Sequence, residues 1–377
     1  MMPGRLDAMA LPPRCAKCAA PYPSQTTPFR CPECGGVFEP AALPAFDSER
    51  VEEEAPGLWR YRHWLPLAEG RPPLWLGEGR TPLVPTTVDG VPVWCKLESL
   101  NPSGSFKDRG SAILVAWLRE RGVSHAVEDS SGNAGASFAA YCAAAGIAAT
   151  IFVPAHAAGA KLAQIESYGA SLIRVSGPRE AAAHEARAAA DRGTAYGSHV
   201  YLPFGLYGIA TLAFEIVEAL GRAPRAIVLP AGHGTLSTGL WLGFSALVAG
   251  KRIARRPRFI LVQAEACAPV YAAWSGAGGS GALAAAASRA EGILIREPIR
   301  RAAMLQAVAS TGGIVARASE SEIEAGQNLL GRAGISAEPT SAVVVAGLRQ
   351  AMAAGALGSN EEGDVVLIIS GHGLKSS

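Results

Sequence analysis

The sequence predicts an α/β fold in which a parallel sheet carries helices on both faces. Short apolar runs, of the kind that buried parallel strands show, recur at residues 226–230, 258–265 and 364–371. Earlier in the chain, similar runs alternate with amphipathic or Ala-rich segments that end at glycine, a common stop signal of a helix. This alternation predicts a parallel sheet, because the crossover between two parallel strands is usually a helix.

Composition places the chain among globular proteins and argues against several other classes. Its 377 residues are enough for two or three domains, and 49% of them are hydrophobic. Lys and Arg number 34 and Asp and Glu 32, so neither sign has an excess with which to coat nucleic acid or anionic lipid. No apolar run reaches the about 18 residues of a membrane-spanning helix.

The amino-terminal stretch MMPGRLDAMALPPR does not have the pattern of a signal peptide, since two prolines interrupt its short apolar run. We therefore expect a soluble, cytoplasmic protein.

Two Cys-x2-Cys pairs, twelve residues apart, stand near the amino terminus: Cys15, Cys18, Cys31 and Cys34. Each spacing lets one tight turn aim two sulfurs at the same ion, and four thiolates complete a closed tetrahedron. The pattern predicts a structural zinc ribbon. Two disulfides are the alternative, which needs an oxidising compartment that nothing else in the sequence supports.

A zinc ribbon can also contact nucleic acid. This one offers mainly three scattered cations, Arg14, Lys17 and Arg30, and no dense basic cluster. We therefore expect no nucleic-acid partner.

The segments after the cysteine pairs follow the predicted alternation. Residues 46–80 are rich in Pro, Glu and Trp, which indicates a connector with short helices. Strands are expected at residues 91–98, 149–154 and 171–177, and helices at 111–122, 136–146, 161–169 and 180–193.

Ligands of such sheets bind beyond the carboxyl ends of the strands, where loops lead into helices. One such loop, NPSGSFKDRG, places Lys107 at the start of a helix. A plain cation is electrostatically unfavourable there, whereas a Schiff base to an aldehyde cofactor suits the position. A solvated lysine is the alternative.

Three further loops carry unusual chemistry. In DSSGNAGAS, from Asp129, small residues expose backbone N–H groups that suit a carboxylate or phosphate, although a serine-capped turn is the alternative. In LPAGHGTLSTG, residues 232–235 open a helix where a phosphate binds, and His233 is either held by backbone or a general base. In IISGHGLK, Ser370 ends the last strand. It is either a residue of the turn or a contact to a ring nitrogen that lies above it.

Together these loops resemble those of the fold-type II pyridoxal-phosphate enzymes, and most closely those of threonine synthase and its relatives. The motifs occur in the family's order from about residue 75 to the end: EGRTPL, KLESLNPSGSFKDRG, SSGNAGAS, AEGILI, AEPTSAVVVAGL and SGHGLK. An amino-terminal four-cysteine element is also found in several threonine synthases.

The resemblance implies two domains, each an open, twisted, mostly parallel sheet with helices on both faces, beside the zinc ribbon of residues 1–45. A large domain that binds pyridoxal 5'-phosphate would comprise 46–110 and 205–377, and a small mobile domain 111–204. The cofactor would lie in the cleft, and the small domain would close over a small amino-acid substrate. A homodimer is a candidate assembly, and no membrane partner is expected.

The resemblance also assigns site residues. Lys107 would hold the cofactor as an internal aldimine and, once released, remove the substrate's α proton. The other expected cofactor contacts are Phe106, Asn133 at the 3′ oxygen, Gly232, His233, Gly234 and Thr235 at the phosphate, and Ser370 at the pyridine nitrogen. The expected substrate contacts are Lys96, Ser130, Ser131 and Gly132.

The resemblance implies a carbon–oxygen lyase that converts O-phosphohomoserine and water to threonine and phosphate. One stretch departs from the family pattern Asn-Pro-x-Arg-x-x-Gly-Gln-Lys-Thr, which contacts the substrate phosphate. Here Leu202 replaces Asn, Gly205 replaces Arg, and Ile209-Ala210 replace Gln-Lys.

A second function therefore stays open, namely β-elimination or β-replacement on serine, threonine or an activated derivative. A binding module with a silent enzyme body is a third, which the intact Lys107 disfavours.

Overall fold

The computed structural model describes residues 12–276, 287–358 and 363–376, which form two compact units. The first unit comprises Met1–Gly79, Asn101–Ser103 and Lys107–Thr211, and the second comprises Arg80–Leu100, Gly104–Phe106 and Leu212–Ser377. The domain limits expected from the sequence stay a prediction. Residues 1–11, where we expected no signal peptide, lie outside the described residues.

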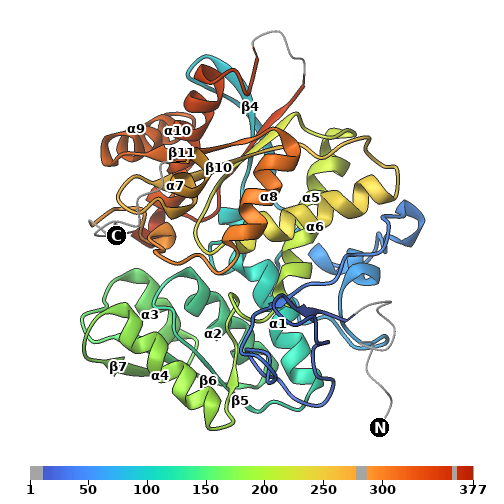
Figure 1. Cartoon of the computed structure of the whole chain (residues 1–377), viewed down its shortest axis with the longest axis vertical. Helices are drawn as coiled ribbons and strands as arrows, with labels where there is room; N and C mark the ends of the chain where they lie inside the picture. The colour runs from blue at the N-terminus through green and yellow to red at the C-terminus, as the bar shows by residue number, and fades with distance from the viewer. Residues whose placement is uncertain (1–11, 277–286, 359–362, 377) are drawn as a thin grey trace. The chain divides into compact units, whose positions relative to one another are not determined.

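The first unit contains a parallel sheet with the strand order β7-β6-β5-β8 (Figure 1). Its strands are β5 (His125–Glu128), β6 (Ala148–Pro154), β7 (Ser171–Val175) and β8 (Ala195–Tyr196). Its helices are α1 (Lys107–Glu120), α2 (Asn133–Ala145), α3 (Ala160–Ser167) and α4 (Arg179–Asp191). Helix α2 packs against α1 and β6, and α4 packs against β5, β6 and β8. The strands and helices predicted between residues 111 and 193 are thus confirmed.

The amino-terminal part of the first unit is a two-stranded antiparallel sheet followed by short 3-10 helices. Strand β1 (Arg14–Cys15) pairs with β2 (Phe38–Glu39) and so brings the two ends of the four-cysteine segment together. The connector forms the 3-10 helices η2 (Ser48–Arg50) and η3 (Gly57–Trp64), which confirms the short helices expected there.

The second unit contains a six-stranded sheet with the order β11-β10-β9-β12-β4-β3, parallel except for β3. Its strands are β3 (Leu83–Val88), β4 (Val91–Lys96), β9 (Ala226–Pro230), β10 (Arg258–Ala264), β11 (Ile314–Ala318) and β12 (Val365–Ile368). Its helices are α6 (Thr235–Ala249), α7 (Pro269–Ser275), α8 (Arg301–Thr311), α9 (Glu320–Arg332) and α10 (Pro339–Ala353). Short 3-10 helices are η4 (Glu98–Leu100), η5 (Glu291–Ile293) and η6 (Gly373–Ser376).

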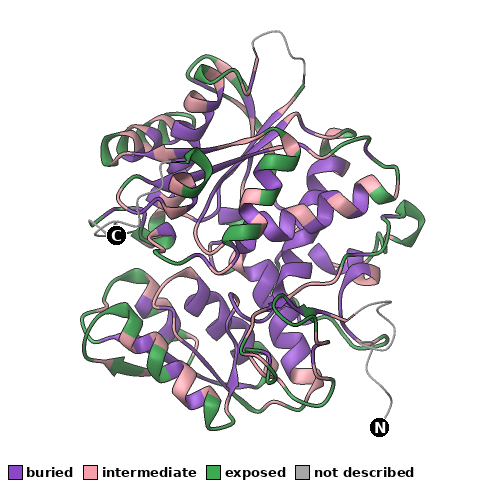
Figure 2. Ribbon diagram, in the orientation of Figure 1, coloured by how far each residue is buried: buried purple, intermediate pink, exposed green. Residues whose placement is uncertain are grey.

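Burial follows this layering, as Figure 2 shows. Every residue of the central strands β9 and β12 is buried, because helices such as α10 cover the sheet. Helix α5 (Gly205–Leu220) begins in the first unit and continues into the second. Two mostly parallel sheets and their helices confirm the predicted α/β class. In the described part of the chain, helices are too short or too polar to cross a membrane.

Candidate active site and four-cysteine site

Lys107 is the first residue of α1, and hydrogen bonds fix the backbone on both sides of it. Before it, the Phe106 N–H donates to the carbonyl of Ser370 at 2.9 Å, within the second unit. After it, in the first unit, the Asp108 carboxylate accepts from the backbone N–H and the hydroxyl of Ser103, at 2.7 and 2.6 Å. These hydrogen bonds therefore fix the backbone from which the Lys107 side chain extends. The position of the amine then depends on the conformation of the side chain.

Ser370 follows β12 and presents a buried neutral hydroxyl. Its Oγ lies 2.9 Å from the Oγ of Ser341 on α10. Ser341 also accepts from the Gly371 N–H at 2.8 Å, so the turn after the strand is tied to the helix. A hydroxyl here, in place of a carboxylate, would leave a facing pyridine nitrogen largely unprotonated.

The loop between β9 and α6 has the features of an anion cradle. Gly234 stands before α6 with φ of +94°, and no side chain caps the helix. A Cβ on Gly234 would lie 3.0 Å from the Cβ of Arg300, so the loop is packed too closely for a larger residue. Among the described residues, the buried Thr238 Oγ1 in the first turn of α6 finds no hydrogen-bond partner. These features fit the phosphate expected at residues 232–235.

The loop before α2 is a second uncapped helix start. Gly132 is the residue before the helix, and no side chain caps the amino terminus of α2 there. The Gly132 N–H donates to the hydroxyl of Ser130 at 3.2 Å, and Asn133 begins the helix. One turn further, the buried Ser137 Oγ has no hydrogen-bond partner among the described residues. The arrangement suits the carboxylate expected at residues 130–132.

Two acidic residues that we had not singled out precede this loop. Glu128 is buried, accepts from the backbone N–H of Ser130, and lies 3.4 Å from Nδ1 of His199. Asp129 accepts a 2.5 Å hydrogen bond from the hydroxyl of Tyr196. Burial raises the pKa of both carboxyls. Two adjacent acidic residues at the end of an apolar strand were the available signal in the sequence. Their partners could not be predicted, because they lie 67 and 71 residues away.

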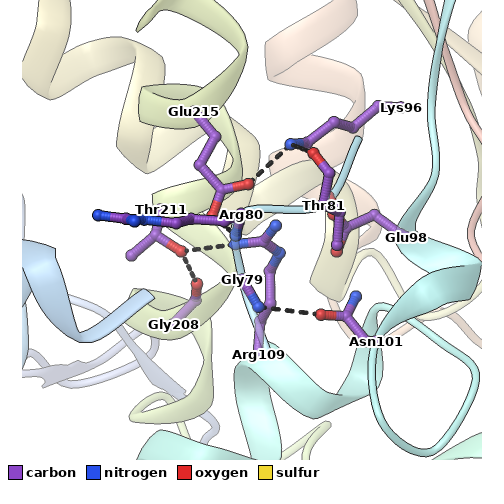
Figure 3. A network of polar contacts seen from close by, with 10 residues as sticks. All are labelled: Gly79, Arg80, Thr81, Lys96, Glu98, Asn101, Arg109, Gly208, Thr211 and Glu215. Carbon is purple, nitrogen blue, oxygen red and sulfur yellow. Dashed lines mark hydrogen bonds and ion pairs between the residues drawn. The ribbon is translucent and has the colours of Figure 1, made fainter. Parts of the chain in front are cut away.

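Lys96 is part of a buried polar network in the second unit (Figure 3). Its Nζ donates to the Thr81 carbonyl at 2.6 Å and to the Glu215 carboxylate at 2.7 Å. Glu215 also accepts from the backbone N–H of Arg80 at 2.8 Å. The two charged side chains are 2% and 5% exposed, so the ammonium is neutralised by a buried partner. A substrate contact by Lys96 stays a prediction.

The four-cysteine cluster has the spacing of a tetrahedral metal site. The four sulfurs all lie within 4.8 Å of one another. The sulfurs of Cys15 and Cys34 are 3.4 Å apart, and those of Cys18 and Cys31 are 3.6 Å apart. Zinc–sulfur bonds of about 2.3 Å in a tetrahedron place the sulfurs roughly 3.8 Å apart, close to these distances. Disulfides would need about 2.05 Å. The donor set and geometry therefore fit zinc.

The three remaining cysteines are buried free thiols: Cys95, Cys142 and Cys267. Burial raises the pKa of Cys95 to about 12, and none of the three belongs to the four-cysteine cluster.

Comparisons with known proteins agree with this picture. A family model described as pyridoxal-phosphate dependent enzyme matches residues 74–371. Threonine synthase of Methanosarcina acetivorans is 32% identical over 96% of this chain and 91% of its own length. Threonine synthase of Mycobacterium tuberculosis is 35% identical over 84% of this chain and 87% of its own length.

Solved structures show the same fold at lower identity. Maize serine racemase is 20% identical and superposes with a TM-score of 0.66 over 78% of this chain and 88% of its own. Serine racemase of Dictyostelium discoideum is 21% identical, with a TM-score of 0.63 over 78% and 92%. These neighbours confirm the fold-type II architecture. Because the family model covers most of the chain and the threonine synthases align along nearly all of it, the chain belongs to the pyridoxal-phosphate dependent enzymes and is related to threonine synthase.

Proposed function

We propose that this enzyme is a carbon–oxygen lyase that uses Lys107 to remove the α proton of an amino acid whose leaving group is not phosphate. The substrate class is serine, threonine or an activated derivative, and the reaction is β-elimination or β-replacement. Pyridoxal phosphate, when bound, supplies an electron sink for the substrate's Cα. The observation that carries the choice of substrate is the packing of α5, described below.

The residues that would hold the cofactor lie in four loops. Lys107 would bind the cofactor aldehyde, Phe106 would pack beside it, and the amide of Asn133 would donate to its 3′ oxygen. The uncapped start of α6, residues 232–235, would bind its phosphate through backbone N–H groups and the Thr235 hydroxyl. Ser370, whose hydroxyl is buried, would face the ring nitrogen.

The substrate contacts orient one carboxylate. Ser130, Ser131 and Gly132 offer hydroxyls and N–H groups at the uncapped start of α2, where the helix dipole also favours an anion. With the carboxylate held there, the neutral Lys107 amine accepts the proton from Cα and returns it later in the reaction. Lys96 is a further candidate contact to a substrate anion.

The start of α5 supports a substrate without phosphate. A Cβ on Gly205 would lie 3.0 Å from the carbonyl oxygen of Gly110, and one on Gly208 only 1.9 Å from that of Arg109. Helices α1 and α5 thus approach through backbone, at the position where threonine synthases carry Arg. Leu202, Ile209 and Ala210 are also buried and apolar, so this stretch offers no guanidinium or ammonium to a phosphate dianion.

Threonine synthase itself, acting on O-phosphohomoserine, is the second candidate. The observation in its favour is the 32–35% identity to proteins of that name over most of the chain.

Two groups of substrates, one without phosphate and one with it, separate the two candidates. We expect the purified holoenzyme to convert serine, threonine or O-acetylserine with a kcat/KM at least about tenfold above that for O-phosphoserine and O-phosphohomoserine. The reason is that a phosphate left without a charged partner loses a hydrogen bond of about 1.5–3 kcal/mol. Released phosphate, ammonia and 2-oxo acid, together with any added thiol, are quantified in the same tube. Stoichiometric phosphate and threonine from O-phosphohomoserine would establish the second candidate instead.

We also propose that Cys15, Cys18, Cys31 and Cys34 bind one structural zinc. The support is the geometry, because the four sulfurs lie within 4.8 Å of one another and one tetrahedral ion can bind all of them.

We therefore expect about one zinc per chain by elemental analysis, and loss of most of it in Cys34→Ser. Cys142→Ser, which changes a buried thiol elsewhere, is the control and should keep its zinc. Zinc-free protein with two disulfides by mass spectrometry would refute the assignment.

A further inference from the structure

The four-cysteine element packs on the rest of the first unit through aromatic side chains. The Tyr22 ring lies 5.7 Å from that of Trp117 on α1 and 4.9 Å from that of Phe204, edge to face in both cases. Trp117 and Phe204 stack on each other at 3.8 Å. This contact joins the four-cysteine element to the segment that leads into α5. In Figure 1 the dark-blue trace of the element lies beside α1.

The tip of the element reaches a second pair of rings. Phe29 lies 5.3 Å from the ring of Tyr196 and 5.5 Å from that of Tyr201. Arg30 donates to the Tyr201 hydroxyl at 3.2 Å, and its guanidinium lies 5.0 Å above the Tyr201 ring. Phe29 and Arg30 directly precede Cys31, so a metal bound to that cysteine would hold the backbone beside both residues.

Tyr196 in turn contacts the strand end that carries the substrate loop. It belongs to β8, which pairs with β5 so that Tyr196 stands opposite Val127. Its ring is buried, and its hydroxyl donates to the Asp129 carboxylate at 2.5 Å. Asp129 directly precedes Ser130, the first residue of the loop proposed to bind the substrate carboxylate.

We infer that Tyr196 is a positioning residue for the 130–132 loop and that the metal-bound four-cysteine element holds it in place through Phe29. The inference rests on the proposed function for the identity of that loop. The physical basis is that the four-cysteine element has two states, folded with its metal and unfolded without it. A segment this short has little apolar core and depends on its metal to fold. Without the metal, Phe29 leaves Tyr196, the Tyr196–Asp129 hydrogen bond loosens, and the loop loses its fixed orientation toward the substrate carboxylate.

Two variants test the two steps of the inference in the holoenzyme. Tyr196→Phe removes the hydroxyl and keeps the ring, and Phe29→Ala removes the ring contact and keeps the cysteines. For each we expect KM for the amino-acid substrate to rise about tenfold, the effect of about 1.4 kcal/mol, with kcat changed much less. Tyr271→Phe is the matched control, because that tyrosine lies on α7 in the second unit, where its ring contacts Trp274 and Arg317. It should leave KM unchanged.

Hydrogen exchange supplies a readout apart from turnover. In Phe29→Ala, and in wild-type enzyme stripped of metal by a chelator, the peptide covering residues 125–133 should exchange faster, while β9 should stay protected. Unchanged exchange and unchanged KM in Phe29→Ala would overturn the inference while leaving the proposed function intact. Absence of turnover in the wild type with every substrate would count against the proposed function, and the exchange experiment would still decide the inference.

Discussion

Replacing Lys107 with alanine is expected to lower kcat by on the order of 10³-fold, because the same amine binds the cofactor and moves the α proton. The variant should fold, since the backbone around it is fixed by groups other than its side chain: Phe106 bonds to Ser370, and Asp108 bonds to Ser103. The measurement is steady-state turnover of the best substrate, alongside the visible absorbance of the bound cofactor.

Lys251→Ala is the control for this prediction, because Lys251 is an exposed lysine beyond the end of α6. It should retain wild-type turnover. A Lys107→Ala enzyme with more than about a tenth of wild-type kcat would show that another group removes the proton.

Replacing Glu215 with glutamine is expected to cost about 3–5 kcal/mol of unfolding free energy. The substitution keeps the shape of the side chain but leaves the buried Lys96 ammonium without its counter-charge, in a place where water cannot replace it. It also puts an amide in reach of the Arg80 N–H, which now donates to a carboxylate oxygen. Urea unfolding of the holoenzyme, followed by circular dichroism, measures the loss.

Two further variants show whether the burial of the pair causes this cost. Lys96→Met combined with Glu215→Leu removes both charges and should recover most of the lost stability. Arg349→Ala breaks a half-exposed pair with Asp89 and should cost less than about 1 kcal/mol. A Glu215→Gln protein as stable as Arg349→Ala would mean that the Lys96 ammonium is not confined as the structure describes.

The sequence was most informative for features that depend on the residues of a single strand or a single loop. Strands β9, β10 and β12 could be predicted because both faces of a buried parallel strand are apolar. Strand β3 was missed, since it lies at the edge of the sheet and contains Pro85 and two threonines, a pattern that a loop also shows. Strand β11 was missed because Arg317 and two alanines weaken its apolar pattern.

Side-chain partnerships could not be predicted in the same way. The ion pair between Lys96 and Glu215 joins residues 119 positions apart, so no local pattern indicates it. Likewise, the contact of Phe29 with Tyr196 follows from the tertiary fold and not from any local pattern. The loop motifs indicated the chemistry, and the structure adds the charges and rings around them.

Reductive labelling tests the central claim, that Lys107 carries the cofactor, most directly. Borohydride fixes pyridoxal phosphate to the amine that holds it, and peptide mass spectrometry then identifies that residue. The account predicts the label on the peptide that contains Lys107 and its absence from Lys107→Ala. A label on another lysine, or none in holoenzyme with full activity, would contradict it.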